Sequence, residues 1–333
     1  MLWFLFALIC VLGWGLADLF YKKGTDEKDR YSHLRIAVWV GLVMGVVSLI
    51  LLPFSESRMN GGSLMANAVK YLPASLGYII SMVIGYAGLR YLELSIVSPV
   101  QNASGALSMI FMLVYFMIVG RITDFWEEFS VLDVIGTVLI IIGVIWLAVA
   151  EHRLAVKESQ EVLHSPDPEE AKKNRKYRYG ALALLFPILY CVFDTIGTAA
   201  DGIILDDEAG LGVGEIDVLI LYGLTFFLAA LGCFIFLWIR EKKLYNPFAF
   251  KTEGNKALAA VAEQFGQIFY VFAMARNPVL AAPMVASYCI VSVILSRIFL
   301  KEKIKPLQAV SVVIVIIGIV ILGFAEGLAV MGD

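Results

Sequence analysis

The sequence has few of the residue types on which most enzymes, metalloproteins and nucleic-acid-binding proteins depend. Charged residues make up only 17% of its 333 positions, against about 25% in soluble domains, and the net charge is −3. The three histidines stand at or near the ends of apolar segments, so they form no cluster that could hold a metal ion or serve a catalytic triad. We therefore expect no cofactor, no metal ion and no nucleic-acid partner.

Cysteine is scarce as well, and its positions argue against a disulfide framework. The chain has four cysteines, all of which lie inside apolar runs: Cys10, Cys191, Cys233 and Cys289. Cysteines in such runs are typical of small buried hydrophobic residues.

Apolar residues dominate the sequence instead, at 60% of all positions, and the mean hydropathy is +0.83. A soluble core of this size could not hide so much apolar surface, so the solvent must be lipid. Ten apolar segments are each long enough to cross a bilayer as a helix, the only element whose backbone is satisfied within one segment. They cover about 2–21, 34–53, 72–91, 96–118, 130–150, 179–201, 216–239, 255–275, 279–299 and 306–325. The sequence thus predicts an all-α integral membrane protein with ten transmembrane helices.

The first of these segments lacks the marks of a cleaved signal sequence. No basic residue precedes its apolar run, and no Ala-x-Ala site follows it. We expect it to be a membrane segment of the protein.

One long polar stretch, residues 151–178, divides the apolar sequence into two similar lengths. Pro166 and Pro168 exclude one continuous helix through it, and a dense run of lysine and arginine ends it. We interpret it as a solvated linker between two domains, residues 1–150 and 179–333.

The two domains show signs of an internal repeat. Four features recur in the same order: Trp14–Asp18 with Tyr190–Asp194, Tyr86 with Tyr270, Pro99 with Pro283, and Ile141–Gly143 with Ile316–Gly318. Each match is weak in so apolar a sequence, and the shared order is the better evidence. Because five helices is an odd number, the second copy must enter the membrane from the opposite side, which predicts two inverted five-helix repeats.

The distribution of basic residues predicts the orientation of the chain. The face that carries the joins after the odd-numbered segments holds 22 of the 26 lysines and arginines. The positive-inside rule then places residues 151–178 in the cytoplasm and both termini outside a multi-pass protein of the cell membrane.

At this point the sequence resembles the EamA-type transporters of the drug/metabolite transporter superfamily, over nearly its whole length. In the first half the resemblance rests on Trp14–Gly15, Tyr91–Val100, Gly120–Ile122 and Ile141–Gly143. In the second half it rests on Ala282–Met284, Lys301–Ile304 and Ile316–Gly318. It implies ten helices in two inverted repeats and transport of a small metabolite. The chain departs from the family in two respects. Arg121 stands where the family often has glutamate. The termini commonly lie inside the cell in the family, whereas the charge count of this sequence places them outside.

Acidic side chains deep in apolar segments are the first candidates for function, because each costs about 2.5–3.5 kcal/mol to insert. Glu263, Gln267 and Tyr270 are spaced as one polar stripe on a helix, which could equally be a helix-packing patch. Asp194 follows Pro187, which should kink its helix. Asp18 lies nearer a segment end, where it could instead form an interfacial salt bridge.

Softer polar and aromatic groups complete the set of candidate substrate or proton ligands. Polar side chains gather near the two repeated prolines: Gln101, Asn102, Ser287 and Tyr288. Trp14 and Tyr190 could offer π faces to an organic cation or could be ordinary core aromatics, and Tyr86 is a repeat-related candidate.

Together these features predict a secondary transporter for a small cationic or zwitterionic solute, such as an amine or an amino acid, with alternating access and room for proton coupling. Its expected partners are the substrate and the lipid bilayer, with a homodimer as an option. Phosphate substrates are disfavoured because no segment has a basic residue at mid-depth. Two alternatives remain: an intramembrane aspartyl protease using Asp18 and Asp194, although the sequence has no Gly-x-Gly-Asp motif, and a non-transporting scaffold.

Overall fold

The computed structural model describes residues 2–26, 29–59, 61, 63–92, 94–163, 185–301 and 306–332, and these contain helices and no strand. Ten helical spans within them are long and apolar enough to cross a bilayer, which confirms the predicted all-α membrane fold. The spans of the first half are formed by α1 (Leu2–Gly24), α2 (Ser32–Leu51), α4 (Leu64–Gly88), α5 with α6 (Leu94–Asn102 and Ser104–Val119), and α8 (Val131–Leu163). Those of the second half are formed by α10 (Leu185–Leu205), α11 (Glu215–Glu241), α12 (Phe250–Met274), α13 with α14 (Pro278–Ala286 and Tyr288–Leu295), and α15 (Pro306–Gly332).

Short elements join or extend these spans. A 3-10 turn (Leu52–Phe54) and α3 (Glu56–Met59) follow α2, α7 (Phe125–Glu128) precedes α8, and a π-helical turn (Ser296–Leu300) ends α14.

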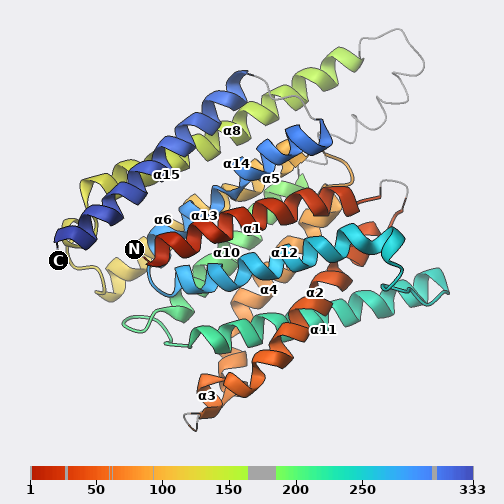
Figure 1. Cartoon of the computed structure of the whole chain (residues 1–333), viewed down its shortest axis with the longest axis horizontal. Coiled ribbons are helices and arrows are strands. Elements are labelled where there is room, and N and C mark those ends of the chain that lie inside the picture. Colours follow the sequence, from red (N-terminus) through yellow and green to blue (C-terminus); the bar gives the residue numbers. More distant parts are fainter. Residues whose placement is uncertain are drawn as a thin grey trace.

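The helices lie roughly along one axis, so the bundle has two ends (Figure 1). Both termini lie at one of them, which we call the terminus end. The opposite end, where α1 and α8 finish, is the linker end. An even number of spans requires the two termini to share an end, as they do here.

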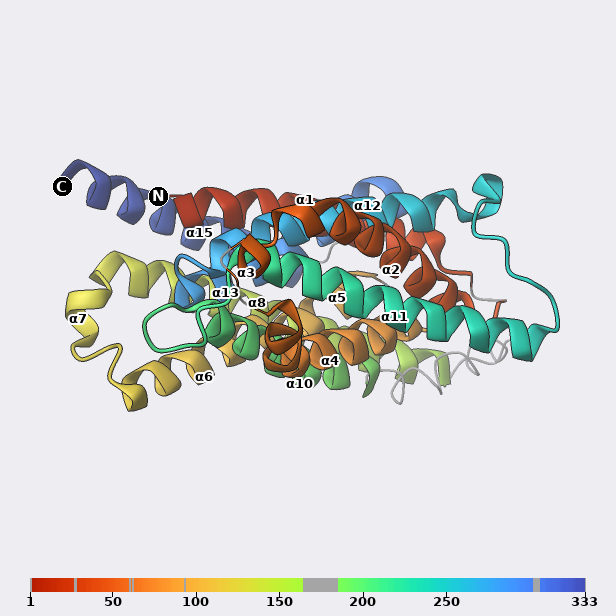
Figure 2. The ribbon, with the colours of Figure 1, turned by 90° about the horizontal axis from the view of Figure 1, so that it is seen from below.

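Each half packs against the other through pairs of neighbouring helices. α1 lies along α12, and α4 lies along α10, while α2 pairs with α11 and α8 pairs with α15 (Figures 1 and 2). If the halves are exchanged, so that each helix takes the place of its counterpart, the pair α1–α12 becomes the pair α10–α4. The pairs α2–α11 and α8–α15 are unchanged. This pattern is the one that a two-fold relation between the halves would produce, and the inverted repeat itself stays a prediction.

The fourth span of each half is interrupted at a related position. Ala103 separates α5 from α6, and Ser287 separates α13 from α14. Each break follows a proline, Pro99 or Pro283, by four residues. Proline removes one backbone hydrogen bond and crowds the preceding turn, which is a common cause of such breaks in membrane helices.

Two helix boundaries differ most from the sequence expectation. α8 continues to Leu163, so the first part of the expected linker is helical, because no proline or glycine occurs between residues 151 and 163. The rest of the linker lies outside the described residues. α4 begins at Leu64 rather than near 72, capped by Ser63, whose Oγ accepts a hydrogen bond from the Ala66 amide, and it passes through Pro73.

Glycine allows α2 and α11 to approach closely. A Cβ atom at Gly41 would lie 2.3 Å from the carbonyl oxygen of Phe226 and 2.4 Å from the Cβ of Ala230. Nearby, the Ser48 hydroxyl donates a hydrogen bond to the carbonyl oxygen of Met44 in its own helix and lies 3.4 Å from that of Leu219 in α11. The contact between these two helices thus joins the halves backbone to backbone.

The predicted orientation can be tested with a cysteine placed at position 160, near the end of α8. If the linker end is cytoplasmic, this cysteine should resist a membrane-impermeant thiol reagent in intact cells and react after the membrane is opened. The native cysteines are buried or half-buried, which keeps the background low. A cysteine that replaces Met59, at the terminus end, should react in intact cells. Ready labelling of position 160 in sealed cells would show that the orientation is the opposite of the predicted one.

Candidate functional site

A narrow cavity lies at the centre of the bundle, between helices of both halves. Its lining residues extend from Tyr78 and Gln267 at mid-height to Tyr21 and Leu89 near the linker end. The complete lining is Trp14, Asp18, Tyr21, Tyr78, Met82, Gly85, Tyr86, Leu89, Gln101, Tyr190, Tyr222, Glu263, Gln267 and Tyr288. The space that the centre of a water molecule can reach is about 40 Å³, which suits only a few water molecules. A solute the size of an amino acid therefore requires the cavity to widen.

Glu263 is one of two carboxylates in this lining, and α12 places it opposite α1. Glu263 is 8% exposed, and Tyr21 lines the same cavity. The indole of Trp14 donates a hydrogen bond of 3.2 Å to the carbonyl oxygen of Glu263. That contact is close because residue 266 is glycine, where a Cβ would lie 2.3 Å from the Trp14 ring. α1 and α12 thereby hold Glu263 beside an aromatic wall.

Asp18 is the second carboxylate, and one of its oxygens ties three helices together. Ser98 of α5 and Ser292 of α14 both donate hydrogen bonds to its Oδ2, at 2.6 and 2.7 Å. The side chain is 9% exposed. The interfacial salt bridge suggested by its place in the sequence is not among the contacts described for Asp18, whose hydrogen-bond partners are the two serines.

Two amide side chains in the cavity lining have hydrogen-bond donors without a described acceptor. The Nε2 atoms of Gln101 in α5 and Gln267 in α12 are buried and have no hydrogen-bond partner among the described residues. Each buried donor without a partner costs about 1–3 kcal/mol, so such groups call for an explanation. A carboxylate or carbonyl oxygen of a ligand could accept a hydrogen bond from such a donor.

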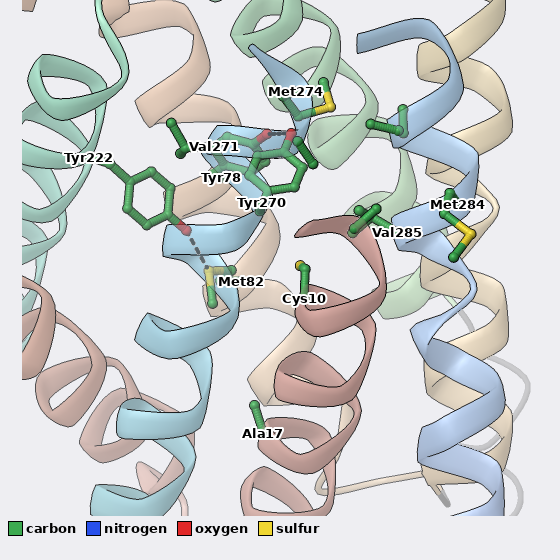
Figure 3. Packing of buried hydrophobic residues seen from close by; sticks show 14 of the residues in the cluster. Cys10, Ala17, Tyr78, Met82, Tyr222, Tyr270, Val271, Met274, Met284 and Val285 are labelled. Atoms are coloured by element: carbon green, nitrogen blue, oxygen red, sulfur yellow. Dashed lines mark hydrogen bonds between the residues drawn. The ribbon is translucent and has the colours of Figure 1, made fainter. Parts of the chain in front are cut away.

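The remaining wall is aromatic. Tyr288 meets Trp14 edge to face at 5.6 Å, and the hydroxyl of Tyr86 donates to that of Tyr21 at 3.1 Å. Tyr222 directs its hydroxyl toward the sulfur of Met82, as Figure 3 shows. Rings that carry hydroxyl groups can contact an organic cation through their faces and a polar group through their edges.

A second polar cluster, which the sequence analysis missed, lies on the terminus side of the cavity. Tyr270 and Tyr78 share a hydrogen bond of 2.6 Å between their hydroxyls, visible in Figure 3. The Tyr78 hydroxyl also lies 3.5 Å from Asp201, a fully buried carboxylate whose Oδ1 has no described partner. Asp201 follows Asp194 by two helical turns and shares its face of α10, which was the available signal.

The structure brings eight of the twelve predicted site residues into the cavity lining and leaves four outside it. The eight are Trp14, Asp18, Tyr86, Gln101, Tyr190, Glu263, Gln267 and Tyr288. Among the other four, Tyr270 packs against Trp14, with their ring centroids 5.0 Å apart. Asp194 accepts a 2.6 Å hydrogen bond from Ser104. Asn102 donates to the carbonyl oxygen of Ser98 in α5 at 2.8 Å, and Ser287, at the break between α13 and α14, donates to that of Met284 at 2.6 Å.

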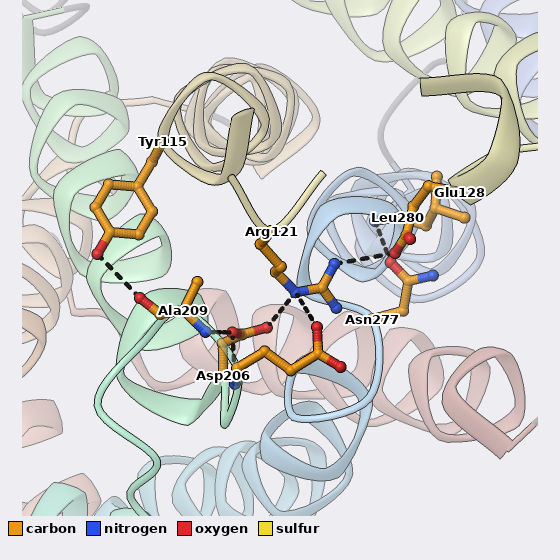
Figure 4. A network of polar contacts seen from close by, with 8 residues as sticks. Tyr115, Arg121, Glu128, Asp206, Ala209, Asn277 and Leu280 are labelled. Atoms are coloured by element: carbon orange, nitrogen blue, oxygen red, sulfur yellow. Dashed lines mark hydrogen bonds and ion pairs between the residues drawn. The ribbon is translucent and has the colours of Figure 1, made fainter. Parts of the chain in front are cut away.

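An ionic network lies at the terminus end of the bundle (Figure 4). Arg121, in the loop after α6, contacts Asp206 of the second half at 2.8 Å and Glu128 at 3.0 Å. Burial by itself would lower the pKa of Arg121, but its contacts with Glu128 and Asp206 raise the pKa overall, so the guanidinium keeps its charge. This network joins the two halves on the side away from the cavity.

Comparison with known proteins adds a family match and a structural likeness. The model of the EamA-like transporter family matches residues 1–149 and 209–324. No curated protein matches the sequence. One solved crystal structure is 13% identical, with a TM-score of 0.58 over 96% of this chain and 95% of the other, a likeness that shows the fold alone.

Proposed function

Because the chain belongs to the EamA-like transporter family, we propose that it is a secondary transporter for a small cationic or zwitterionic solute, such as an amine or an amino acid. It is a multi-pass membrane protein with ten candidate spans. The proposal places it in the cell membrane, where the substrate and the lipid bilayer are its partners.

One observation carries the choice of substrate class. The central cavity contains two carboxylates, Glu263 and Asp18, and its described lining includes no lysine, arginine or histidine. Anionic substrates such as phosphate esters require basic ligands, whereas an ammonium group is stabilised by carboxylates and aromatic faces. The buried amide donors of Gln101 and Gln267 would receive the carboxylate of a zwitterion, so an amino acid uses more of the site than a simple amine does.

Alternating access would follow from movement between the halves. The narrow cavity must widen to admit such a solute, and the Arg121 network would have to separate for it to open at the terminus end. The helix breaks at Ala103 and Ser287 lie in spans that supply cavity residues, so bending there would change the shape of the site. A proton carried by Glu263 would provide the coupling ion.

The substrate class can be tested by thermal stabilisation of the purified full-length protein. We expect a panel of amino acids to raise the melting temperature more than the matching decarboxylated amines, and neither sugar phosphates nor acidic sugars to raise it. Replacing Gln267 by leucine should remove the advantage of amino acids over amines and leave the response to amines in place. If only anions raised the melting temperature, the proposed substrate class would be wrong. If no compound in the panel raised it, the result would favour the alternative of a non-transporting scaffold.

The aspartyl protease alternative receives less support from the geometry. A protease of that kind needs its two carboxylates to share a proton. Asp18 instead accepts hydrogen bonds from Ser98 and Ser292, whereas Asp194 accepts one from Ser104. The replacement of both aspartates by asparagine would separate the two functions, since only the protease predicts loss of membrane-peptide cleavage with transport intact.

A further inference from the structure

A second hollow opens on the side of the bundle near the linker end, apart from the central cavity. It lies between α2 and α4 of the first half and α10 and α11 of the second. The space that the centre of a water molecule can reach is about 680 Å³, and the groove is open on one side. None of its lining residues belongs to the lining of the central cavity.

The inner part of this groove is lined by apolar residues of two helices. Ile79, Val83 and Ala87 form one wall along α4. Ala229, Gly232 and Cys233 form the other wall along α11. A Cβ atom built at Gly232 would meet nothing within 4 Å, so this wall has open space in front of Gly232.

The mouth of the groove is lined by two arginines, Arg30 and Arg90, and by His33, and the described lining contains no aspartate or glutamate. The Arg90 guanidinium donates a 2.9 Å hydrogen bond to the carbonyl oxygen of Arg30, which fixes the two residues side by side. Two carboxylates near the mouth, those of Asp29 and Glu241, contact Arg35 at 2.8 and 2.6 Å.

Two further features at the mouth favour an anion. The N-terminus of α2 begins at Ser32, between Arg30 and His33, and a helix N-terminus carries a partial positive charge. The Nδ1 atom of His33 is buried and has no hydrogen-bond partner among the described residues, so the tautomer with a proton on this atom could donate to a bound anion.

From this combination we propose that the groove binds one anionic phospholipid from the leaflet at the linker end. The phosphate group lies among Arg30, His33 and Arg90, and an acyl chain runs along α4 and α11 over Gly232. Basic pockets between membrane helices are suited to anionic headgroups, and the apolar depth of the groove excludes a free phosphate as the main ligand. Because the walls come from both halves, the lipid spans the interface between them.

Native mass spectrometry of the full-length protein, with phosphatidylglycerol and phosphatidylcholine added in turn, tests this site. We expect phosphatidylglycerol to bind more strongly, and Arg30→Gln to lower its affinity about fivefold and the affinity of the zwitterionic phosphatidylcholine by less. The Arg30 side chain is exposed, so its removal should not disturb folding. Arg297 is also exposed and lies near the linker end but outside the groove, so Arg297→Gln should leave both affinities unchanged.

A second variant tests the apolar wall along α11. Gly232→Leu should weaken binding of phosphatidylglycerol while it leaves any binding of soluble glycerol phosphate unchanged. Equal affinity for the two lipids, the same loss in Arg30→Gln and Arg297→Gln, or full competition by glycerol phosphate would each overturn the proposal. The last of these outcomes would identify the mouth as a site for a free anion.

Discussion

Replacing Glu263 by glutamine should leave the protein folded and lower its transport rate by about 30-fold or more. Glutamine has nearly the same shape, so the cavity keeps its form while it loses one of its two carboxylates. In the proposed complex, Glu263 pairs with the ammonium group of the solute. Removing one partner of a buried, hydrogen-bonded charge pair costs about 2–5 kcal/mol, which sets the expected loss of transport rate. Uptake of a labelled amino acid into proteoliposomes, measured between pH 5 and 8, would show both the lower rate and any loss of pH dependence.

Glu127→Gln provides the matched control. This residue is exposed in the short helix α7, so the same change of charge occurs far from the cavity and transport should be unaffected. Wild-type rates at every pH in Glu263→Gln would reduce Glu263 to a packing residue.

A methyl group at Gly41 should destabilise the whole protein by about 1–3 kcal/mol, which would lower its melting temperature by several degrees. In Gly41→Ala, the new Cβ would overlap the carbonyl oxygen of Phe226 and the Cβ of Ala230, so α2 and α11 must move apart. The displaced atom on α11 is backbone, which cannot turn aside as a flexible side chain can. Thermal unfolding followed by circular dichroism in detergent is the measurement.

The control for this prediction is Gly232→Ala, in the helix that faces Gly41. Its methyl group meets nothing within 4 Å, and alanine is the better helix former, so we expect no loss of stability. Equal melting temperatures for the two variants would show that α2 and α11 separate at little cost.

Most of the fold could be predicted from hydropathy alone, because a bilayer leaves a helix as the only shape for an apolar segment. The ends of the helices could not. Residues 151–163 are polar, yet α8 continues through them, since a helix that leaves the membrane persists until a residue breaks it. Leu64 to Tyr71 likewise belong to α4 although their hydropathy falls below that of a span.

The candidate site was only partly readable from the sequence, for a geometric reason. Spacing on one helix places Glu263, Gln267 and Tyr270 on one face, but the cavity ends between the second and the third. The hydroxyl of Tyr270 is hydrogen-bonded to that of Tyr78, a residue of another helix. The spacing of residues along one helix cannot predict a partner on another helix. Tyr21 follows Asp18 by one turn and was the residue that the same reasoning could have found.

The oxygen of Asp18 that ties α1 to α5 and α14 has a consequence for how cargo and movement are linked. A bound ammonium group that approached this Oδ2 would compete with Ser98 and Ser292 for the lone pairs of one atom. Each new contact with the cargo would therefore loosen a contact between α1 and a broken helix, one from each half. Asp18 would act as an exchange point, at which interactions that hold the resting shape are replaced by interactions with the solute.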